Sequence, residues 1–177
     1  MGGLTTERHD TAEFDSGEPS LDTWLREHAA PAAKRGTALT WVWTDSNGRV
    51  VAYYSLAAHK VARGDVPARL GRGGPAEVAA ILLAKLALTR GHQGRGLGSV
   101  LAFDALERVA AATEQVAARF VVVEAISERA ASFYQRLWFR RVPASMLLVQ
   151  KTADIATAIA QVLKKDVGNV PRCGHGG

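Results

Sequence analysis

The chain has 177 residues, of which 47% are hydrophobic and 22% are charged, and its formal net charge is +5. This length and composition indicate one globular domain with a sizeable core, and the single cysteine, Cys173, excludes a disulfide framework. No apolar stretch approaches the ~18 residues of a membrane span. We therefore expect a cytoplasmic protein without a membrane partner, whose positive charge serves either solubility or a polyanionic partner.

The N-terminal region is expected to contain a short strand and a helix. Residues 4–9 are compatible with a first strand. Residues 18–36 carry apolar side chains at helical spacing, and Ser20 is a suitable N-cap for this helix. Pro31 is expected to end or kink the helix, because proline lacks the backbone N–H that a helix interior needs.

A β-hairpin is expected next, at residues 37–45 and 50–58. Both segments are rich in β-branched and aromatic side chains, and the intervening Ser-Asn-Gly-Arg is a turn signal. Residues 62–79 are rich in glycine and proline and predict a loop. Residues 79–89 are almost continuously apolar, which is typical of a buried central strand.

The second half of the chain alternates between helices and strands. In chain order we expect a helix at 97–116, a strand at 119–126, a helix at 127–137, a strand at 146–151 and a helix at 152–165. Ser127 is the expected N-cap of the second helix. An apolar stripe on the first helix consists of Leu97, Val100, Leu101, Ala105, Leu106 and Val109.

This order of elements predicts an α/β domain with a mixed sheet over residues 1–166. Glycine, proline and polar residues predict a flexible tail over residues 167–177. No metal site is expected, because the cysteine and histidine of this tail lack further ligands. The apolar face of residues 153–163 is expected either to cover the sheet or to serve a homodimer.

A glycine-rich segment, Gln-Gly-Arg-Gly-Leu-Gly-Ser at residues 93–99, joins the buried strand to the long helix. The first amides of a helix lack partners within it and lie at the positive end of its dipole, so they attract anions. Glycines let the chain curl and let a ligand approach the backbone closely. The segment predicts a phosphate-binding turn to which Arg95 adds a charge, and a connection without a ligand is the alternative.

The glycine spacing does not match two common nucleotide sites. A P-loop requires lysine followed by serine or threonine after its last glycine, and this pair is missing here. A dinucleotide-binding turn requires a third glycine where Ser99 stands and an acidic residue about 20 positions later. The chain is basic and apolar there, from Arg119 to Val123.

The spacing of Gln93, Gly96 and Gly98, preceded by residues 86–88, resembles the signature of the Gcn5-related N-acetyltransferases, the GNAT family. Residues 124–139, with their Phe-Tyr-x-Arg core, resemble a second motif of this family. The resemblance implies an α/β fold of the GNAT type, with a mixed, mostly antiparallel sheet, splayed central strands and flanking helices. It also implies that acetyl-CoA is the acetyl donor.

The resemblance further implies residue roles. The residues implied in binding the donor are Leu86, Ala87, Leu88, Gln93, Gly94, Arg95, Gly96, Leu97, Gly98, Ser99 and Phe133. Tyr134 is implied as the general acid for the leaving thiolate, because a phenol (pKa ~10) stays protonated at pH 7; a buried structural tyrosine is the alternative. The Leu88 backbone N–H is expected to polarise the thioester carbonyl. Helical spacing predicts that Phe133 faces the core with Ala130 and Leu137, and that Tyr134 faces elsewhere.

A narrower resemblance, to the TacT-type acetyltransferase toxins of bacterial toxin–antitoxin pairs, is carried by residues 14–29, 48–57, 86–98, 104–109 and 131–139. It implies that the chain acetylates the α-amino group of aminoacyl-tRNA, which blocks translation, and that a ribbon-helix-helix antitoxin neutralises it. Ser16, Thr89 and Trp138 depart from the family pattern, which often has cysteine, aspartate and glycine at these positions.

The substrate side of the reaction is less well defined by the sequence. Glu124 acting through water is the best candidate for a general base, but no role is assigned, since an α-amine (pKa ~7.7–8.0) is partly neutral at pH 7. A surplus of basic residues predicts an RNA surface that includes Arg90, Arg136, Arg140 and Arg141. Two other functions stay open: a GNAT acetyltransferase of small amines or protein N-termini, and a non-catalytic CoA-binding regulatory module.

Overall fold

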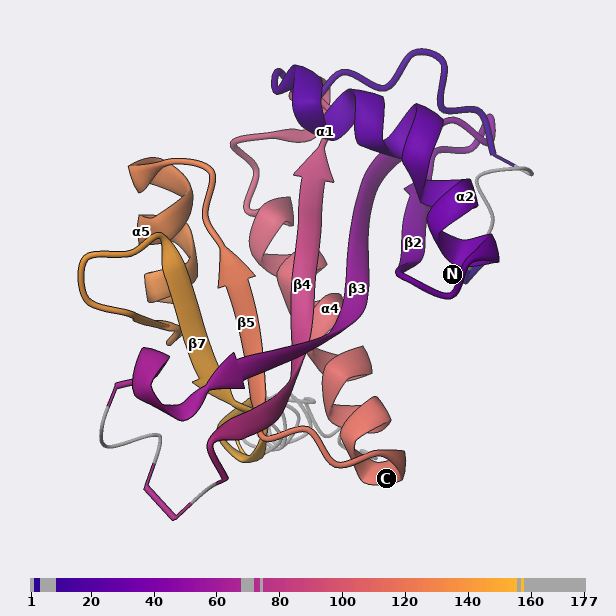
Figure 1. The fold of residues 1–177 in the computed structure, drawn as a ribbon. Coiled ribbons are helices and arrows are strands. Elements are labelled where there is room, and N and C mark those ends of the chain that lie inside the picture. Colours follow the sequence, from indigo (N-terminus) through magenta and orange to yellow (C-terminus); the bar gives the residue numbers. More distant parts are fainter. Residues whose placement is uncertain (1, 4–8, 68–71, 74, 156, 158–177) are drawn as a thin grey trace, which may run out of the picture.

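The computed structural model describes residues 2–3, 9–67, 72–73, 75–155 and 157. One sheet runs through the molecule, and helices cover both of its faces (Figure 1). The expected strand at 4–9, apart from His9, and most of the expected helix at 152–165 lie outside the described residues. The tail at 167–177 also lies outside them, so the domain boundary at residue 166 stays a prediction.

Among the described residues, seven strands form the sheet, in the order β1-β2-β3-β4-β5-β7-β6. Their bounds are β1 (Gly2–Gly3), β2 (Leu39–Thr44), β3 (Val50–Ala62), β4 (Glu77–Leu88), β5 (Phe120–Glu124), β6 (Arg140–Arg141) and β7 (Leu147–Lys151). All neighbouring strands are antiparallel except β4 and β5, which are parallel. The expected mixed, mostly antiparallel sheet is confirmed.

The hairpin of β3 and β4 is longer than the sequence predicted. Residues 57–62 and 77–82, partly assigned to a loop, pair with each other in register. Alanine, histidine and lysine give little strand signal in this part of β3, because their preference for strands is weak. Cross-strand pairing nevertheless continues to Ala62 and Glu77, and a salt bridge of 2.8 Å joins Lys60 to Glu77 across the two strands.

In the part of the chain that the structure describes, helical segments connect the strands, and residues 152–155 after β7 are also helical. They are α1 (Pro19–Thr23), η2 (Trp24–His28, a π-helix), α2 (Ala29–Lys34), η3 (Arg63–Asp65), η4 (Arg90–His92), α4 (Leu97–Gln115) and α5 (Glu128–Arg136). The expected N-cap at Ser20 is wrong, because Glu18 is the extended residue before the helix and Pro19 takes the first helical position. Proline is favoured there because its fixed φ suits a helix start and its missing N–H is not needed.

Pro31 does not end the first helical region. The π-helix η2 precedes it, and α2 continues through it to Lys34. Pro31 is thus in the first turn of α2, where a backbone N–H has no partner within the helix. The hydrogen-bond pattern changes from π-helical to α-helical at His28, three residues before Pro31.

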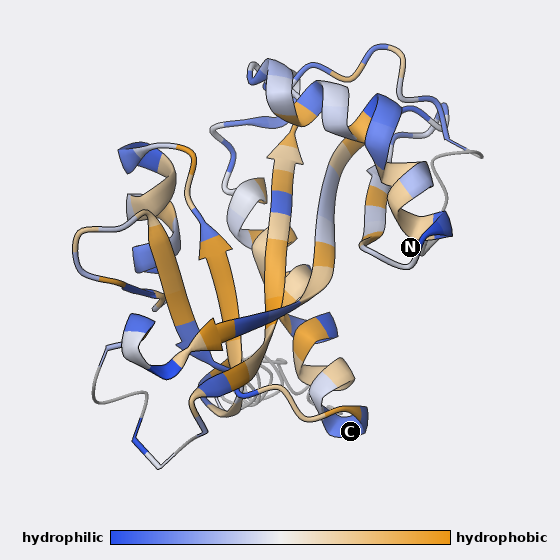
Figure 2. Ribbon diagram, in the orientation of Figure 1, coloured by the Kyte–Doolittle hydropathy of each residue, from blue (hydrophilic) through white to orange (hydrophobic). Residues whose placement is uncertain are grey.

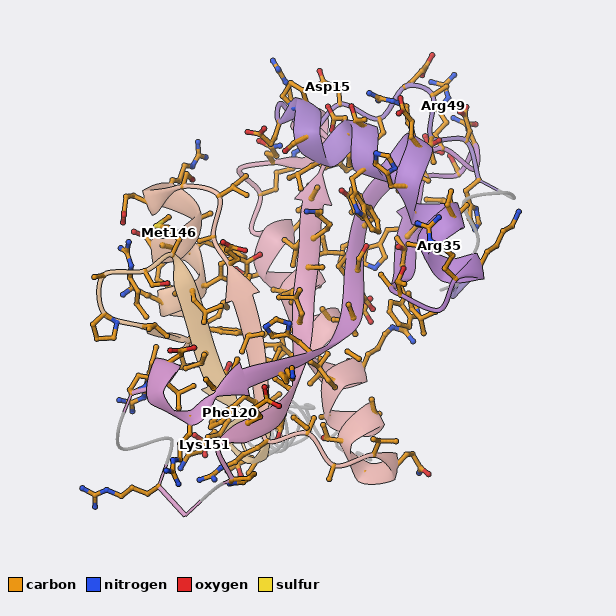
Figure 3. The ribbon with its side chains drawn as sticks, viewed as in Figure 1. Asp15, Arg35, Arg49, Phe120, Met146 and Lys151 are labelled. Atoms are coloured by element: carbon orange, nitrogen blue, oxygen red, sulfur yellow. The ribbon has the colours of Figure 1, made fainter. Side chains whose placement is uncertain are left out.

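Two faces of the sheet carry separate cores. On one face, α4 and α5 pack on a cluster that includes Tyr54, Val121 and Val123. On the other face, the α1–α2 region packs on Tyr53 and its neighbours. Strands β5 and β7 are mostly apolar, as Figure 2 shows, because side chains on both faces of these strands are largely covered. In Figure 3, Asp15 lies at the opposite end of the molecule from Phe120 and Lys151.

Helix α4 presents the predicted stripe to the sheet, with one exception. Leu101, Ala105, Leu106 and Val109 are buried, whereas Val100 is 54% exposed. Val100 lies one residue, or about 100°, from Leu101 around the helix, which carries it off the buried side.

We expect Leu101→Ala to lower the free energy of unfolding by about 2–5 kcal/mol, because Leu101 is fully buried and its removal leaves a cavity. Val100→Ala is the matched control on the same helix and should change it by less than about 0.5 kcal/mol. Urea titration followed by circular dichroism measures both values. Equal losses for the two variants would contradict the packing of α4 described above.

Candidate active site

The candidate site forms where β4 and β5 separate. The two strands pair only at Ala80, Ile81 and Leu82 of β4, although β4 continues to Leu88 and β5 to Glu124. A β-bulge lies just after the last pair, because Ser55 of β3 is opposite Lys85 and Leu56 is opposite Leu83. Bulges bend a strand and increase its twist. The expected splay of the central strands is thus present.

The end of β4 turns polar backbone groups toward the gap. The Thr89 N–H donates to the carbonyl of Val51, so these opposite residues form a hydrogen-bonded pair. In an antiparallel ladder such pairs alternate with non-bonded ones, whose N–H and C=O groups point away from the partner strand. Leu88 and Leu86 therefore direct their backbone groups away from β3, toward the side where β5 has diverged.

The glycine-rich turn lies between β4 and α4. Gly94 and Gly96 have φ angles of +75° and +78°, and Gly96 is the N-cap of α4. This left-handed region strains residues that carry a Cβ, which explains the two glycines. A Cβ at Gly98 would lie 3.6 Å from Phe133 and 3.7 Å from Leu88, so this glycine sits directly against the aromatic helix and the strand end.

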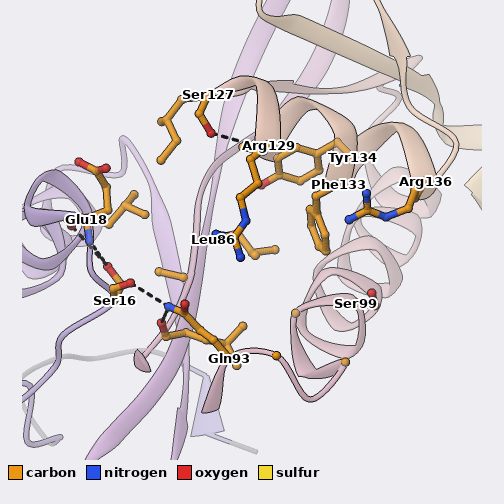
Figure 4. Close-up of a pocket in the computed structure, with 18 residues that line it drawn as sticks. Ser16, Glu18, Leu86, Gln93, Ser99, Ser127, Arg129, Phe133, Tyr134 and Arg136 are labelled. Atoms are coloured by element: carbon orange, nitrogen blue, oxygen red, sulfur yellow. Dashed lines mark hydrogen bonds between the residues drawn. The ribbon is translucent and has the colours of Figure 1, made fainter. Parts of the chain in front are cut away.

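Gln93 fastens the turn to two other segments. Its Nε2 donates to the carbonyl of Leu88 at 2.9 Å and to the carbonyl of Ser16 at 2.8 Å (Figure 4). Ser16 is itself held by the buried carboxylate of Asp22, which accepts from the Ser16 Oγ at 2.6 Å and from the Ser16 N–H at 2.9 Å. The turn, the end of β4 and the segment before α1 are therefore linked through one amide side chain.

A cavity of about 510 Å³ lies along this arrangement. The predicted residues that line it are Leu86, Ala87, Leu88, Gln93, Gly94, Gly96, Gly98, Ser99, Phe133, Tyr134 and Arg136. Arg95 and Leu97 are not among its lining residues. The cavity brings together the strand end, the glycine turn and α5, which are far apart in the sequence.

Several other lining residues lie outside the site that the sequence predicts. They are Ser16, Glu18, Leu21, Ile126, Ser127, Arg129 and Ala130. The α1 segment has no motif that marks it as a cavity wall. The residues of α5 could have been found, because Arg129 and Ala130 lie one turn from Phe133 and Tyr134 on the same helix.

Helix α5 begins at the predicted N-cap, since the Ser127 Oγ accepts a hydrogen bond from the Ala130 N–H. The predicted faces of this helix are partly wrong. Tyr134 and Ala131 are buried in the main core, whereas Phe133 and Ala130 are only partly buried. Residues three and four apart share a helix face, so Ala131 and Tyr134 lie together on the side of α5 that packs against the core.

Tyr134 is placed at the junction of the core and the cavity. It is 7% exposed and makes edge-to-face contacts with Phe133 and Phe139, at centroid distances of 5.1 and 5.7 Å. Its hydroxyl end points into the cleft (Figure 4). Burial raises the pKa of the Tyr134 phenol above its ordinary value, because the phenolate would lose its hydration. The side chain can therefore donate a proton over the whole physiological pH range.

The basic residues predicted for RNA have different surroundings. Arg136 lines the cavity together with Arg129, and Figure 4 shows their guanidinium groups on either side of Phe133. Arg141 forms a two-pronged ion pair with Glu128, at 2.7 and 2.8 Å, and Arg90 pairs with Asp15 at 3.2 Å. Arg140 lies exposed on β6.

Trp138 follows α5 with a φ of +67° and is 59% exposed. A glycine would adopt this left-handed conformation without strain. The chain therefore makes the left-handed turn that a glycine at this position would favour, although tryptophan stands here.

Two negative findings concern the described part of the chain. It contains no group of three or more His, Cys, Asp or Glu side chains that could hold a metal ion. None of its helices is both long and apolar enough to span a membrane.

Known proteins resemble this chain over most of its length. Residues 5–139 match the acetyltransferase (GNAT) family. A tRNA-acetylating toxin of Mycobacterium tuberculosis is 40% identical over 147 residues, which cover 81% of this chain and 88% of the toxin.

Two solved structures extend the resemblance to the fold. The structure of AtaT complexed with acetyl-methionyl-tRNAfMet superposes on this chain with a TM-score of 0.82 and is 25% identical to it in sequence. The superposition covers 89% of this chain and 97% of AtaT. A tyrosine-to-phenylalanine mutant of KacT superposes on this chain with a TM-score of 0.79 and is 28% identical to it in sequence. The superposition covers 85% of this chain and 92% of KacT.

We expect Gln93→Ala to loosen the glycine turn, because both carbonyls that Gln93 joins lose their shared donor. Amide hydrogen exchange of residues 89–96 should become faster, and the free energy of unfolding should fall by about 1 kcal/mol. Gln135→Ala, at an exposed glutamine of α5, is the control and should leave exchange in the turn unchanged. Unchanged exchange in the Gln93 variant would show that the turn holds its shape without this side chain.

Proposed function

The chain belongs to the acetyltransferase (GNAT) family, and on this premise we propose that it transfers the acetyl group of acetyl-CoA to the α-amino group of aminoacyl-tRNA. The proposal assigns it to the toxins of bacterial toxin–antitoxin pairs, which a ribbon-helix-helix antitoxin neutralises. The observation that carries the choice of substrate is the 40% identity with the tRNA-acetylating toxin, which spans 81% of the chain.

The cavity residues fit acetyl-CoA as the donor. The glycine turn lines the cavity with backbone at Gly94, Gly96 and Gly98, next to the start of α4, and this arrangement favours a diphosphate. Arg136 supplies a positive charge at the same cavity. The backbone N–H and C=O of Leu86 and the N–H of Leu88 are directed toward the gap, where the amide groups of the donor's pantetheine chain can bond to them as a neighbouring strand would.

The reaction follows from the position of Tyr134 and of the Leu88 backbone. The amine lone pair forms a C–N bond with the thioester carbonyl carbon, and the C–S bond then breaks. In this proposal the Leu88 N–H donates to the carbonyl oxygen as its negative charge increases. Tyr134 gives its phenolic proton to the leaving sulfur and is reprotonated from solvent, while the nitrogen releases its surplus proton to water.

No residue is assigned as a general base for the acceptor amine, and an α-amine suits a site without one. Its reference pKa of ~7.7–8.0, against ~10.4 for a lysine side chain, leaves an appreciable neutral fraction at pH 7. Glu124 lines the acceptor side of the gap and is exposed to water. The exposed arginines around α5 suit an RNA backbone, which carries one negative charge per nucleotide.

We expect Tyr134→Phe to lower the rate of acetylation by about 10²- to 10⁴-fold, because the leaving sulfur loses its proton donor. Mass spectrometry of aminoacyl-tRNA after incubation with acetyl-CoA measures the product. Tyr54→Phe is the matched control, since Tyr54 is buried on the same face of the sheet and is not among the residues that line the cavity. Acetyl-CoA binding, measured by calorimetry, should persist in both variants. Full activity of Tyr134→Phe would overturn the acid role of Tyr134.

The pH profile of the reaction provides a separate test of Tyr134. With an α-amine acceptor, kcat/KM should rise with pH until the amine is neutral, at about pH 8, because only the neutral amine attacks. It should then stay level to about pH 10, because burial raises the pKa of the Tyr134 phenol and keeps its proton in place. A decline beginning near pH 8 would mean that a group with a lower pKa supplies the proton.

A further inference from the structure

Lys85 of β4 lies in a second cavity, next to the residues that carry out the proposed reaction. This cavity has a volume of about 350 Å³, and Lys85 lines it together with Leu86, Glu124 and Tyr134. We propose that the chain transfers the acetyl group of acetyl-CoA to the Nζ of its own Lys85 when no charged tRNA occupies the site, and that this modification slows the enzyme. The inference rests on the proposed function, because it uses the same acetyl donor and the same proton donor.

The side chain of Lys85 is partly buried and has no fixed partner among the described residues. No hydrogen bond or ion pair joins its Nζ to another of them, although Glu124 lines the same cavity. By contrast, the side chain of Lys60 on β3 is 69% exposed and pairs with Glu77 at 2.8 Å. The Nζ of Lys85 can therefore move within the cavity, whereas Lys60 is an ordinary surface lysine.

Lys85 extends from β4 on the face of the sheet that the α1–α2 region covers. Ala87 belongs to the core on this face, and alternate residues of a strand share a face, so Lys85 lies there as well. Tyr134 belongs to the core on the other face. Since Lys85 and Tyr134 line one cavity, the gap between β4 and β5 connects the two faces at this point.

Lys85 also lies within reach of the proposed position of the thioester. It is three residues from Leu88 on the same strand, a span of about 10 Å, because a strand rises about 3.4 Å per residue. The flexible four-carbon stem of a lysine covers more than half of this span. An amine that is tethered close to an acyl group reacts as if it were highly concentrated, which offsets the small neutral fraction of a lysine at pH 7.

The transfer to Lys85 needs no group beyond those already assigned. The neutral Nζ forms a C–N bond with the thioester carbonyl carbon, and the C–S bond breaks. Tyr134 gives its phenolic proton to the leaving sulfur and is reprotonated from solvent, while the nitrogen loses its surplus proton to water. The products are free CoA and a chain that carries acetyl-lysine at position 85.

Acetylation changes the second cavity in two ways. The side chain of Lys85 loses its positive charge, and it becomes longer by an acetyl group inside a cavity that Tyr134 also lines. This group then takes up space beside the proton donor. The modified chain is therefore expected to acetylate tRNA more slowly, so the reaction at Lys85 limits the activity of the protein when charged tRNA is scarce.

Deuterated acetyl-CoA tests the inference, because its label marks only the acetyl groups that are transferred during the experiment. The full chain is incubated with this donor in the absence of tRNA, and peptide mass spectrometry measures the labelling rate at each lysine. We expect Lys85 to be labelled at least about 10-fold faster than Lys60, which reports the uncatalysed reaction of an exposed lysine. Dilution of the protein should leave the rate per chain unchanged, because the transfer occurs within one molecule.

Two variants separate an enzymatic transfer from an adventitious one. Tyr134→Phe should lower the labelling rate of Lys85 to that of Lys60 and leave Lys60 unaffected, because only the first reaction uses the phenolic proton. Lys85→Arg removes the acceptor and keeps the positive charge. Preincubation with acetyl-CoA should lower the later rate of tRNA acetylation severalfold in the unaltered chain and leave the rate of Lys85→Arg constant.

The outcomes separate the inference from the proposed function. Acetylated tRNA, with Lys85 labelled no faster than Lys60, would overturn the transfer to Lys85 and leave tRNA acetylation standing. A labelling rate per chain that falls on dilution would mean that one molecule modifies another, which also contradicts the inference. Rapid labelling of Lys85 without any acetylated tRNA would overturn the proposed substrate alone.

Discussion

The separation of β4 from β5 is the constraint on which the rest of the site depends. Three residues of β4 pair with β5, and the bulge at Ala84 then turns the strand away. Had the ladder continued, the backbone groups of Leu86 and Leu88 would bond to β5, and their side of the sheet would be closed. The gap instead holds two cavities, and Tyr134 lines both of them.

The segment before α1 helps to hold one wall of the gap, because it is hydrogen-bonded to the glycine turn through Gln93. Asp22 holds Ser16, and Ser16 accepts from Gln93, which also holds the end of β4. The glutamine of the family signature thus acts here on the protein's own backbone. Its side chain sets the shape of the glycine turn, while the backbone of the turn stays available to a ligand.

The local features of the site could be predicted from the sequence, whereas several of its walls could not. The glycine turn, the strand before it and the aromatic helix carry dense short-range signals, and all three line the donor cavity. The wall around Ser16 and Leu21 has no such signal, because nothing in its sequence indicates which distant segment it will contact. The exposure of Val100 and the burial of Tyr134 likewise depend on how α4 and α5 are rotated against the sheet.

The sequence by itself determined the family, the order of most elements, the N-cap of α5 and the turn at residues 93–99, because each depends on residues close together in the chain. Tertiary structure alone decided the full length of the hairpin of β3 and β4, the continuation of the helix through Pro31 and the pairing of Arg141 with Glu128. It also decided which side of α5 meets the core. These features arise from contacts between distant segments, whose free energy outweighs the weak local preferences that a sequence displays.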